Sequence, residues 1–118
     1  MYNYRDLIVW QKAMNLVETT YRITSDFPSE EKYGIVSQIR RSAVSIPSNI
    51  AEGAGRNSKK SFRSFLEITN GSINELKTQL EISNRIGYLD NDVLTTLFDN
   101  CDEVQKITVA LIKKYSTS

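Results

Sequence analysis

Apolar residues recur along this chain at alternating spacings of three and four, which is typical of amphipathic helices in a bundle. The first such stretch covers residues 5–24 and carries two series. We predict that one series faces the bundle core: Leu7, Trp10, Met14, Val17 and Tyr21. The other series then needs a second burial partner, and we predict that it contacts another copy of the chain: Val9, Ala13, Leu16, Thr20 and Ile23. The alternatives within one chain are cover by residues 1–6 or by the end of the second helix.

A second helix is predicted from Ser29 to about Gly53. Pro28 disfavours helical geometry at the residue before it, and Ser29 is a good N-cap. Pro47 lies inside this helix, where it removes one backbone donor and is expected to bend the axis. The predicted core residues are Val36, Ile39, Ala43, Ile46 and Ile50.

The third and fourth helices are bounded by end signals. Ser58 is the predicted N-cap of the third helix, Gly87 follows its end near Ile86, and Asp90 caps the fourth helix. Gly71 lies inside the third helix, where we expect another helix to approach closely. The predicted core residues are Phe62, Phe65, Leu66, Thr69, Ile73, Leu76 and Leu80, followed by Leu94, Leu97, Cys101, Val104, Thr108, Leu111 and Tyr115. A weaker outer set on the third helix is assigned to the intermolecular interface: Ile68, Ile82 and Ile86.

Four long helices with short connections predict an all-α fold, an antiparallel up-and-down four-helix bundle, with residues 1–118 as one domain. The chain contains no histidine, which removes the commonest general base and metal ligand. Its one cysteine, Cys101, falls on a core series, and we expect a packed thiol. We therefore predict no enzymatic activity, no cofactor and no metal. The start of the chain lacks a signal-peptide pattern and no run is long enough to cross a membrane, so we expect a cytoplasmic protein without a membrane partner.

The side-chain charges nearly cancel, leaving a formal net charge of +1, so any electrostatic partner must be met by a local patch. One stretch, residues 40–63, holds a single acid, Glu52, and six basic residues that we predict to contact RNA or DNA: Arg40, Arg41, Arg56, Lys59, Lys60 and Arg63. The alternative is that these charges are merely solvated or pair with acids on neighbouring helices. Since no recognition motif is present, any binding should be directed mostly to the phosphate backbone.

Several segments resemble the bacterial four-helix bundle family known as the 23S rRNA intervening-sequence proteins. The most specific of them is Ser45-Ile46-Pro47-Ser48-Asn49-Ile50-Ala51-Glu52-Gly53, and others are residues 7–13, 27–31, 38–43, 71–76 and 85–89. The resemblance implies an antiparallel bundle that assembles into ring-like homopentamers. Some members are encoded inside intervening sequences of 23S rRNA genes. The accessory variability proteins of diversity-generating retroelements are similar, and that likeness implies the six basic residues as nucleic-acid contacts.

The sequence thus leads to one functional hypothesis and one alternative. The hypothesis is a non-enzymatic homo-oligomer, a pentamer by resemblance, that binds the RNA or DNA backbone through the basic residues. The alternative is a ring that serves as a scaffold for another protein and has no nucleic-acid role. The role of Asn49 and Glu52, structural or as specific polar contacts, stays open.

Overall fold

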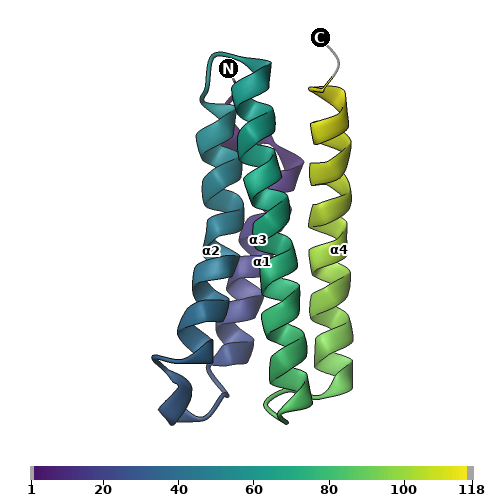
Figure 1. Cartoon of the computed structure of the whole chain (residues 1–118). Coiled ribbons are helices and arrows are strands. Elements are labelled where there is room, and N and C mark those ends of the chain that lie inside the picture. The colour runs from purple at the N-terminus through teal and green to yellow at the C-terminus, as the bar shows by residue number, and fades with distance from the viewer. Residues whose placement is uncertain (1, 117–118) are drawn as a thin grey trace.

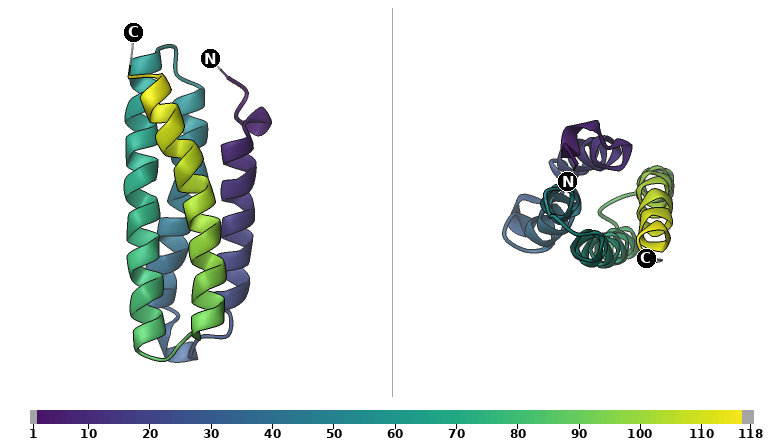
Figure 2. Two further views of the ribbon diagram at one scale, coloured as in Figure 1. Left: turned by 90° about the vertical axis from the view of Figure 1, so that its right-hand side faces the viewer. Right: turned by 90° about the horizontal axis from the view of Figure 1, so that it is seen from above.

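The chain forms four long helices that run alternately down and up the molecule (Figure 1). The computed structural model describes residues 2–116. The helices are α1 (Ile8–Thr24), α2 (Ile35–Ala54), α3 (Lys59–Arg85) and α4 (Asn91–Lys114), with short 3-10 turns η1 (Tyr4–Asp6) and η2 (Ser29–Glu31). Seen from the end, they enclose one interior in the order α1, α2, α3, α4 (Figure 2). The predicted all-α four-helix bundle is confirmed.

The predicted signals at three helix ends are confirmed. The Ser58 hydroxyl accepts a hydrogen bond from the backbone N–H of Ser61 at 3.1 Å, and the Asp90 carboxylate accepts one from Val93 at 2.8 Å. After α3, Gly87 adopts a φ of +90°, and the N–H of Tyr88 donates to the Ser83 carbonyl at 2.8 Å. This bond belongs to a Schellman motif, which satisfies the last carbonyls of the helix.

The start of the second helix differs from the prediction. Ser29 opens the short turn η2, and α2 begins only at Ile35. The connection between α1 and α2 is anchored to the loop after α3. The rings of Phe27 and Tyr88 lie 5.5 Å apart, and the Tyr88 hydroxyl donates to the Glu31 carboxylate at 2.8 Å. That hydrogen bond also raises the pKa of Tyr88 above its ordinary value. These tertiary contacts outweigh the local capping preference of Ser29.

The series of α1 that is fully buried in the core is the other of the two, although Leu7, Trp10 and Val17 of the predicted series also pack against the core. Four residues assigned to the intermolecular interface are buried inside the single chain, with exposed fractions of 0–1%: Val9, Ala13, Leu16 and Thr20. The series assigned to the core is only half-buried or exposed. Both series have helical spacing, so spacing alone does not determine which series faces the core. Ala13 is fully buried, and the buried Thr20 hydroxyl is satisfied within the helix by donating to the Leu16 carbonyl at 2.7 Å. The interface prediction for these four residues is therefore wrong.

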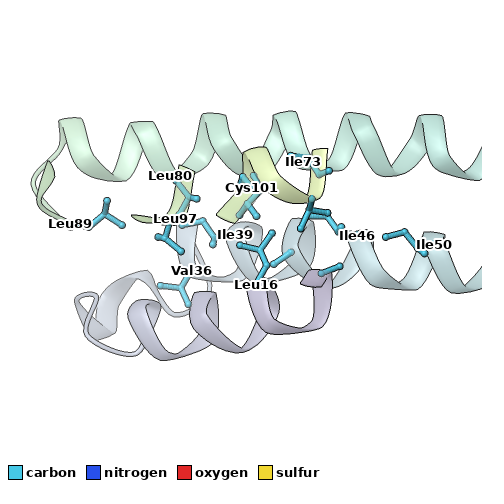
Figure 3. Packing of buried hydrophobic residues seen from close by; sticks show 14 of the residues in the cluster. Leu16, Val36, Ile39, Ile46, Ile50, Ile73, Leu80, Leu89, Leu97 and Cys101 are labelled. Carbon is cyan, nitrogen blue, oxygen red and sulfur yellow. The ribbon is translucent and has the colours of Figure 1, made fainter. Parts of the chain in front are cut away.

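The core itself is built from aliphatic side chains of all four helices. Leu16, Ile39 and Cys101 point into a common interior from α1, α2 and α4 (Figure 3). Cys101 is fully buried, and desolvation raises the pKa of its thiol to about 12. It is a packed thiol, as predicted. Pro47 is buried within α2, and the helix continues past it to Ala54.

A close helix contact occurs at a different glycine from the predicted one. A Cβ atom added to Gly71 would meet nothing within 4 Å. At Gly53, an added Cβ would lie 2.7 Å from the Phe65 Cβ and 2.9 Å from the Phe62 Cδ1. The absence of a side chain at Gly53 therefore lets the end of α2 meet the start of α3.

Candidate nucleic-acid interface

The six basic residues predicted to form one site fall into two groups. Arg40 and Arg41 lie in the first half of α2, whereas Arg56, Lys59, Lys60 and Arg63 surround the connection between α2 and α3. We call the latter four residues the connection group. Ala54 comes thirteen residues after Arg41, which is about 20 Å along the helix axis. The sequence places them in one stretch, but the fold does not bring them to one place.

Arg40 links α2 to the end of α1. Its Nε donates to the Thr24 hydroxyl at 3.0 Å, and its Nη2 donates to the Tyr21 carbonyl at 3.2 Å. The guanidinium also lies 4.4 Å from the centre of the Tyr21 ring, a cation–π distance. A phosphate contact would compete with all three interactions, so we assign Arg40 to the fold. Arg41 is exposed and lies beside a shallow hollow that also includes Tyr33, Glu75 and Gln79.

The connection group presents two kinds of charge. Lys59 and Lys60 are exposed and have no ion-pair partner among residues 2–116. Arg56 pairs with Glu52 at 2.7 Å and lies 5.0 Å from the centre of the Phe65 ring. Arg63 lies 3.7 Å from Glu67. Both ion pairs are substantially exposed, so each contributes little stability and can yield to a stronger anion.

The end of the bundle that carries this group is held by an aromatic assembly. The Phe62 ring lies 5.1 Å from the Tyr115 ring and 5.8 Å from the Tyr2 ring. The Tyr115 hydroxyl donates to the Tyr2 hydroxyl at 2.9 Å, and the Tyr2 N–H donates to the Ala54 carbonyl at 2.8 Å. Burial, followed by this hydroxyl contact, raises the pKa of Tyr115 to about 12. The N-terminal arm, the start of α3 and the end of α4 are thereby fixed together.

This arrangement adds residues that the sequence did not assign to the site. Lys113 is exposed and lies two residues before Tyr115, at the same end of the bundle as Lys59. In the sequence, Lys113 and Lys114 are explained by the helix dipole, which favours cations at a C-terminus. The predicted up-and-down topology was the signal that could have found them, because it places the end of the fourth helix beside the start of the third.

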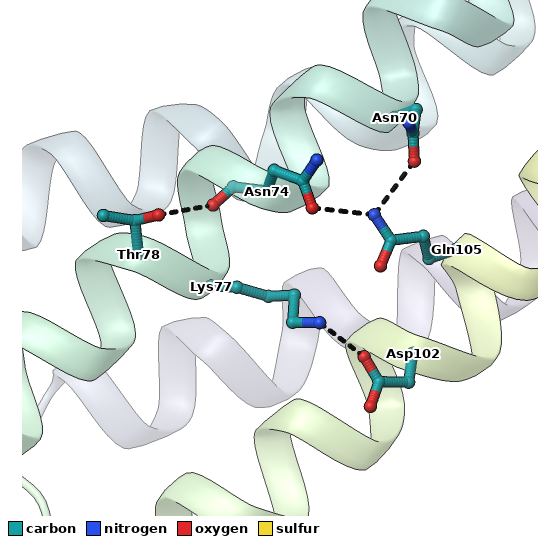
Figure 4. A network of polar contacts seen from close by, with 6 residues as sticks. All are labelled: Asn70, Asn74, Lys77, Thr78, Asp102 and Gln105. Atoms are coloured by element: carbon teal, nitrogen blue, oxygen red, sulfur yellow. Dashed lines mark hydrogen bonds and ion pairs between the residues drawn. The ribbon is translucent and has the colours of Figure 1, made fainter.

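Other polar contacts hold the helices in register. The Gln105 amide donates to Asn70 at 2.9 Å and to Asn74 at 2.8 Å, and Lys77 pairs with Asp102 at 2.6 Å (Figure 4). These groups satisfy one another across α3 and α4, so we assign them to the fold. Residues 2–116 contain no group of His, Cys, Asp and Glu side chains that could hold a metal ion. None of the helices in that range is long and apolar enough to cross a membrane.

Apolar side chains also line a shallow groove between α1 and α2. We call it the outer groove, and its lining residues are Tyr4, Trp10, Met14, Val17, Val44, Pro47, Ser48, Ala51 and Glu52. Of the residues predicted for the interface, Ile23 is half-buried, while Ile68, Ile82 and Ile86 are 52%, 44% and 54% exposed. Those three isoleucines remain available to a partner.

The fold defines a class: an antiparallel four-helix bundle in which an aromatic assembly fixes the end that carries the connection group. The sequence profile of the 23S rRNA-intervening sequence proteins matches residues 5–110, and the chain belongs to this family. A solved structure from Bacteroides thetaiotaomicron VPI-5482, described as a protein of unknown function from the S23 ribosomal protein family, is similar in fold, with a TM-score of 0.81 and 24% sequence identity. The similarity covers 90% of this chain and 99% of that chain. No curated protein matches the sequence.

Proposed function

We propose that this chain is a non-enzymatic homo-oligomeric protein that binds the phosphate backbone of RNA or DNA through the end of the bundle bearing the α2–α3 connection. The observation that carries the proposal is the pair Lys59 and Lys60, two exposed ammonium groups without an acidic partner among the described residues. They stand on the first turn of α3, next to the aromatic assembly around Phe62.

The mechanism is electrostatic. A lysine that approaches a phosphate releases a condensed counterion, so affinity arises without base recognition and falls as salt rises. Arg56 and Arg63 add two guanidinium groups whose exposed partners, Glu52 and Glu67, screen them only weakly. The family is named for an intervening sequence of 23S rRNA, which makes structured RNA the first probe to test.

Self-association is the second part of the proposal, and a pentamer is implied by the resemblance. Two apolar surfaces support it: the outer groove between α1 and α2, and the exposed isoleucines of α3. A contiguous apolar surface on a small protein commonly marks an interface. An oligomer repeats a modest basic patch several times, so weak phosphate contacts combine through avidity.

The proposal is tested by fluorescence-anisotropy titration of a labelled RNA hairpin and a labelled DNA duplex. We expect the wild-type chain to bind, and the double variant Lys59→Glu with Lys60→Glu to lose at least tenfold in affinity. Both side chains are exposed, so circular dichroism should show an unchanged fold. Absence of binding by the wild-type chain, or full binding by the double variant, contradicts the proposal.

The alternative function, a scaffold for another protein, is favoured by the outer groove alone. Half-buried Trp10 and Met14 offer the kind of apolar, adaptable surface that protein partners use. Salt separates the two functions, because docking in an apolar groove responds little to ionic strength while phosphate binding weakens steeply.

A further inference from the structure

The small net charge of the chain conceals a separation of charge along the bundle. The Lys12–Glu103 ion pair and the hydrogen bond of 2.9 Å between Ser45 and Ser72 lie near the middle of the long axis. On the side of the α2–α3 connection, the basic residues are Arg5, Arg56, Lys59, Lys60, Arg63, Lys106, Lys113 and Lys114, and the acids are only Asp6, Glu52 and Glu67. We call this half the basic end.

The opposite half has the reverse composition. Its acids are Glu18, Asp26, Glu30, Glu31, Glu75, Glu81, Asp90, Asp92, Asp99 and Asp102, and its basic residues are Arg22, Lys32, Arg40, Arg41, Lys77 and Arg85. The ten acids outnumber the six basic residues, so this half carries a net negative charge. This half therefore repels a polyanion.

The two halves act separately in solution. The molecule is 47 Å long, whereas the Debye length is about 10 Å at 0.1 M salt. A phosphate at one end is therefore influenced mainly by the charges of that end and hardly by the overall net charge. For this reason a formal charge of +1 does not argue against a binding surface for polyanions.

Within the basic end, α4 carries a pair of lysines aligned with each other. Lys106 and Lys113 are exposed and seven residues apart, so they share one helix face at a separation of about 10 Å. They border a shallow hollow formed with Val109 and Ala110. Two acids lie on the same face toward the acidic half: Asp102, which pairs with Lys77 at 2.6 Å, and the exposed Asp99, seven residues before Lys106.

We infer that the polyanion site is confined to the basic end and has two sides, Lys59 and Lys60 on α3 and Lys106 and Lys113 on α4. The inference rests on the proposed function and extends it to a second helix. The contact between Tyr115 and Phe62 holds the two sides together, since Tyr115 follows Lys113 by two residues and Phe62 follows Lys60 by two. A phosphate backbone laid across this end contacts both helices and leaves the acidic half in solvent.

The test compares two double variants with the same loss of charge. Lys106→Gln with Lys113→Gln removes the α4 side, and Arg22→Gln with Lys32→Gln removes two exposed charges from the acidic half. The RNA hairpin and the DNA duplex are titrated against each variant at about 50 mM salt. We expect the α4 variant to lose at least tenfold in affinity and the control to change less than twofold. For the duplex, the slope of log K against log salt should become shallower by about two per chain in the α4 variant.

Two outcomes overturn the inference while leaving the proposed function intact. Equal losses in both double variants would mean that Lys106 and Lys113 contribute no more to binding than charges of the opposite half. An unchanged α4 variant, beside a Lys59→Glu and Lys60→Glu variant that has lost binding, would confine the site to the connection group. Lysine acetylation of the wild-type complex gives an independent readout: bound RNA should protect Lys106 and Lys113 and leave Lys32 reactive. Lack of any wild-type binding would instead overturn the proposed function.

Discussion

Two glycines inside helices of this bundle differ in how much space their surroundings leave for a side chain. Gly53 faces Phe65 and Phe62 at distances too short for a Cβ atom, while Gly71 faces open space. The sequence shows both simply as glycines within helices, so propensity alone cannot separate them. The close approach was predicted at the wrong one because the identity of the facing residue depends on the packing of α2 against α3.

The two glycines provide a matched pair of substitutions. Gly53→Ala should destabilise the fold by about 1–3 kcal/mol, because the new methyl group forces the start of α3 away. Gly71→Ala should stabilise it by about 0.5–1 kcal/mol, because alanine favours the helix and meets nothing. Urea denaturation measures both, and equal effects of the two substitutions would contradict the assigned contact.

Cys101 makes stability depend on pH in the alkaline range. Burial raises the pKa of its thiol from 9.0 to about 12, so the neutral thiol stabilises the folded state below pH 9 and that contribution is lost as pH rises toward 12. We expect the free energy of unfolding to fall more steeply over this range in the wild-type chain than in Cys101→Ala. Tyr115 adds a loss above pH 10 in both proteins, so their difference reports Cys101. Parallel curves would contradict the buried thiol.

Among the elements, α1 and α2 show which features a periodic pattern can and cannot predict. The number of helices and several of their ends followed from the three-and-four spacing and from Ser58, Gly87 and Asp90, because those signals are local. The pattern did not predict which face of α1 is turned to the core, since two of its faces carry the same spacing. The partner of Arg40 was equally hidden, because it depends on how the end of α1 meets α2.

The neighbouring arginines of α2 test this contact between elements. Arg40→Gln removes the bonds to Thr24 and Tyr21 and should destabilise the fold by about 1–2 kcal/mol, whereas Arg41→Gln, an exposed change, should stay within about 0.5 kcal/mol. Thermal unfolding distinguishes them. If both variants unfold like the wild-type chain, the assignment of Arg40 to the fold is wrong.

At the scale of the whole molecule, topology organises charges that the sequence presents as balanced. Arg5 lies in η1, Lys60 at the start of α3 and Lys113 at the end of α4. These three segments are far apart in the sequence but lie at one end of the bundle, because the helices run up and down (Figure 2). The net charge of the full sequence hides this difference, because it sums the charges of this end with those of the acidic half. The candidate site could thus be predicted in part, through Lys59 and Lys60, while its α4 side required the fold.

Self-association is also a property of the whole molecule. We expect the wild-type chain to show a multiple of its 13.5 kDa mass by light scattering. Val44→Glu places a charge in the outer groove, where Val44 is 40% exposed, and should reduce that mass. Ile8→Glu is the control, because Ile8 is 60% exposed and lies outside the groove. A smaller mass for the control alone, or a monomeric wild-type chain, would contradict assembly through this groove.

The most direct test of the central claim is the affinity of the wild-type chain for a DNA duplex at about 50 and 200 mM salt. Four phosphate contacts, one for each of Lys59, Lys60, Lys106 and Lys113, predict a loss of about a hundredfold between these concentrations for a single bound chain. A loss of that size or greater supports a basic end that holds the phosphate backbone. Equal affinity at both concentrations, or no binding at the lower one, would contradict it.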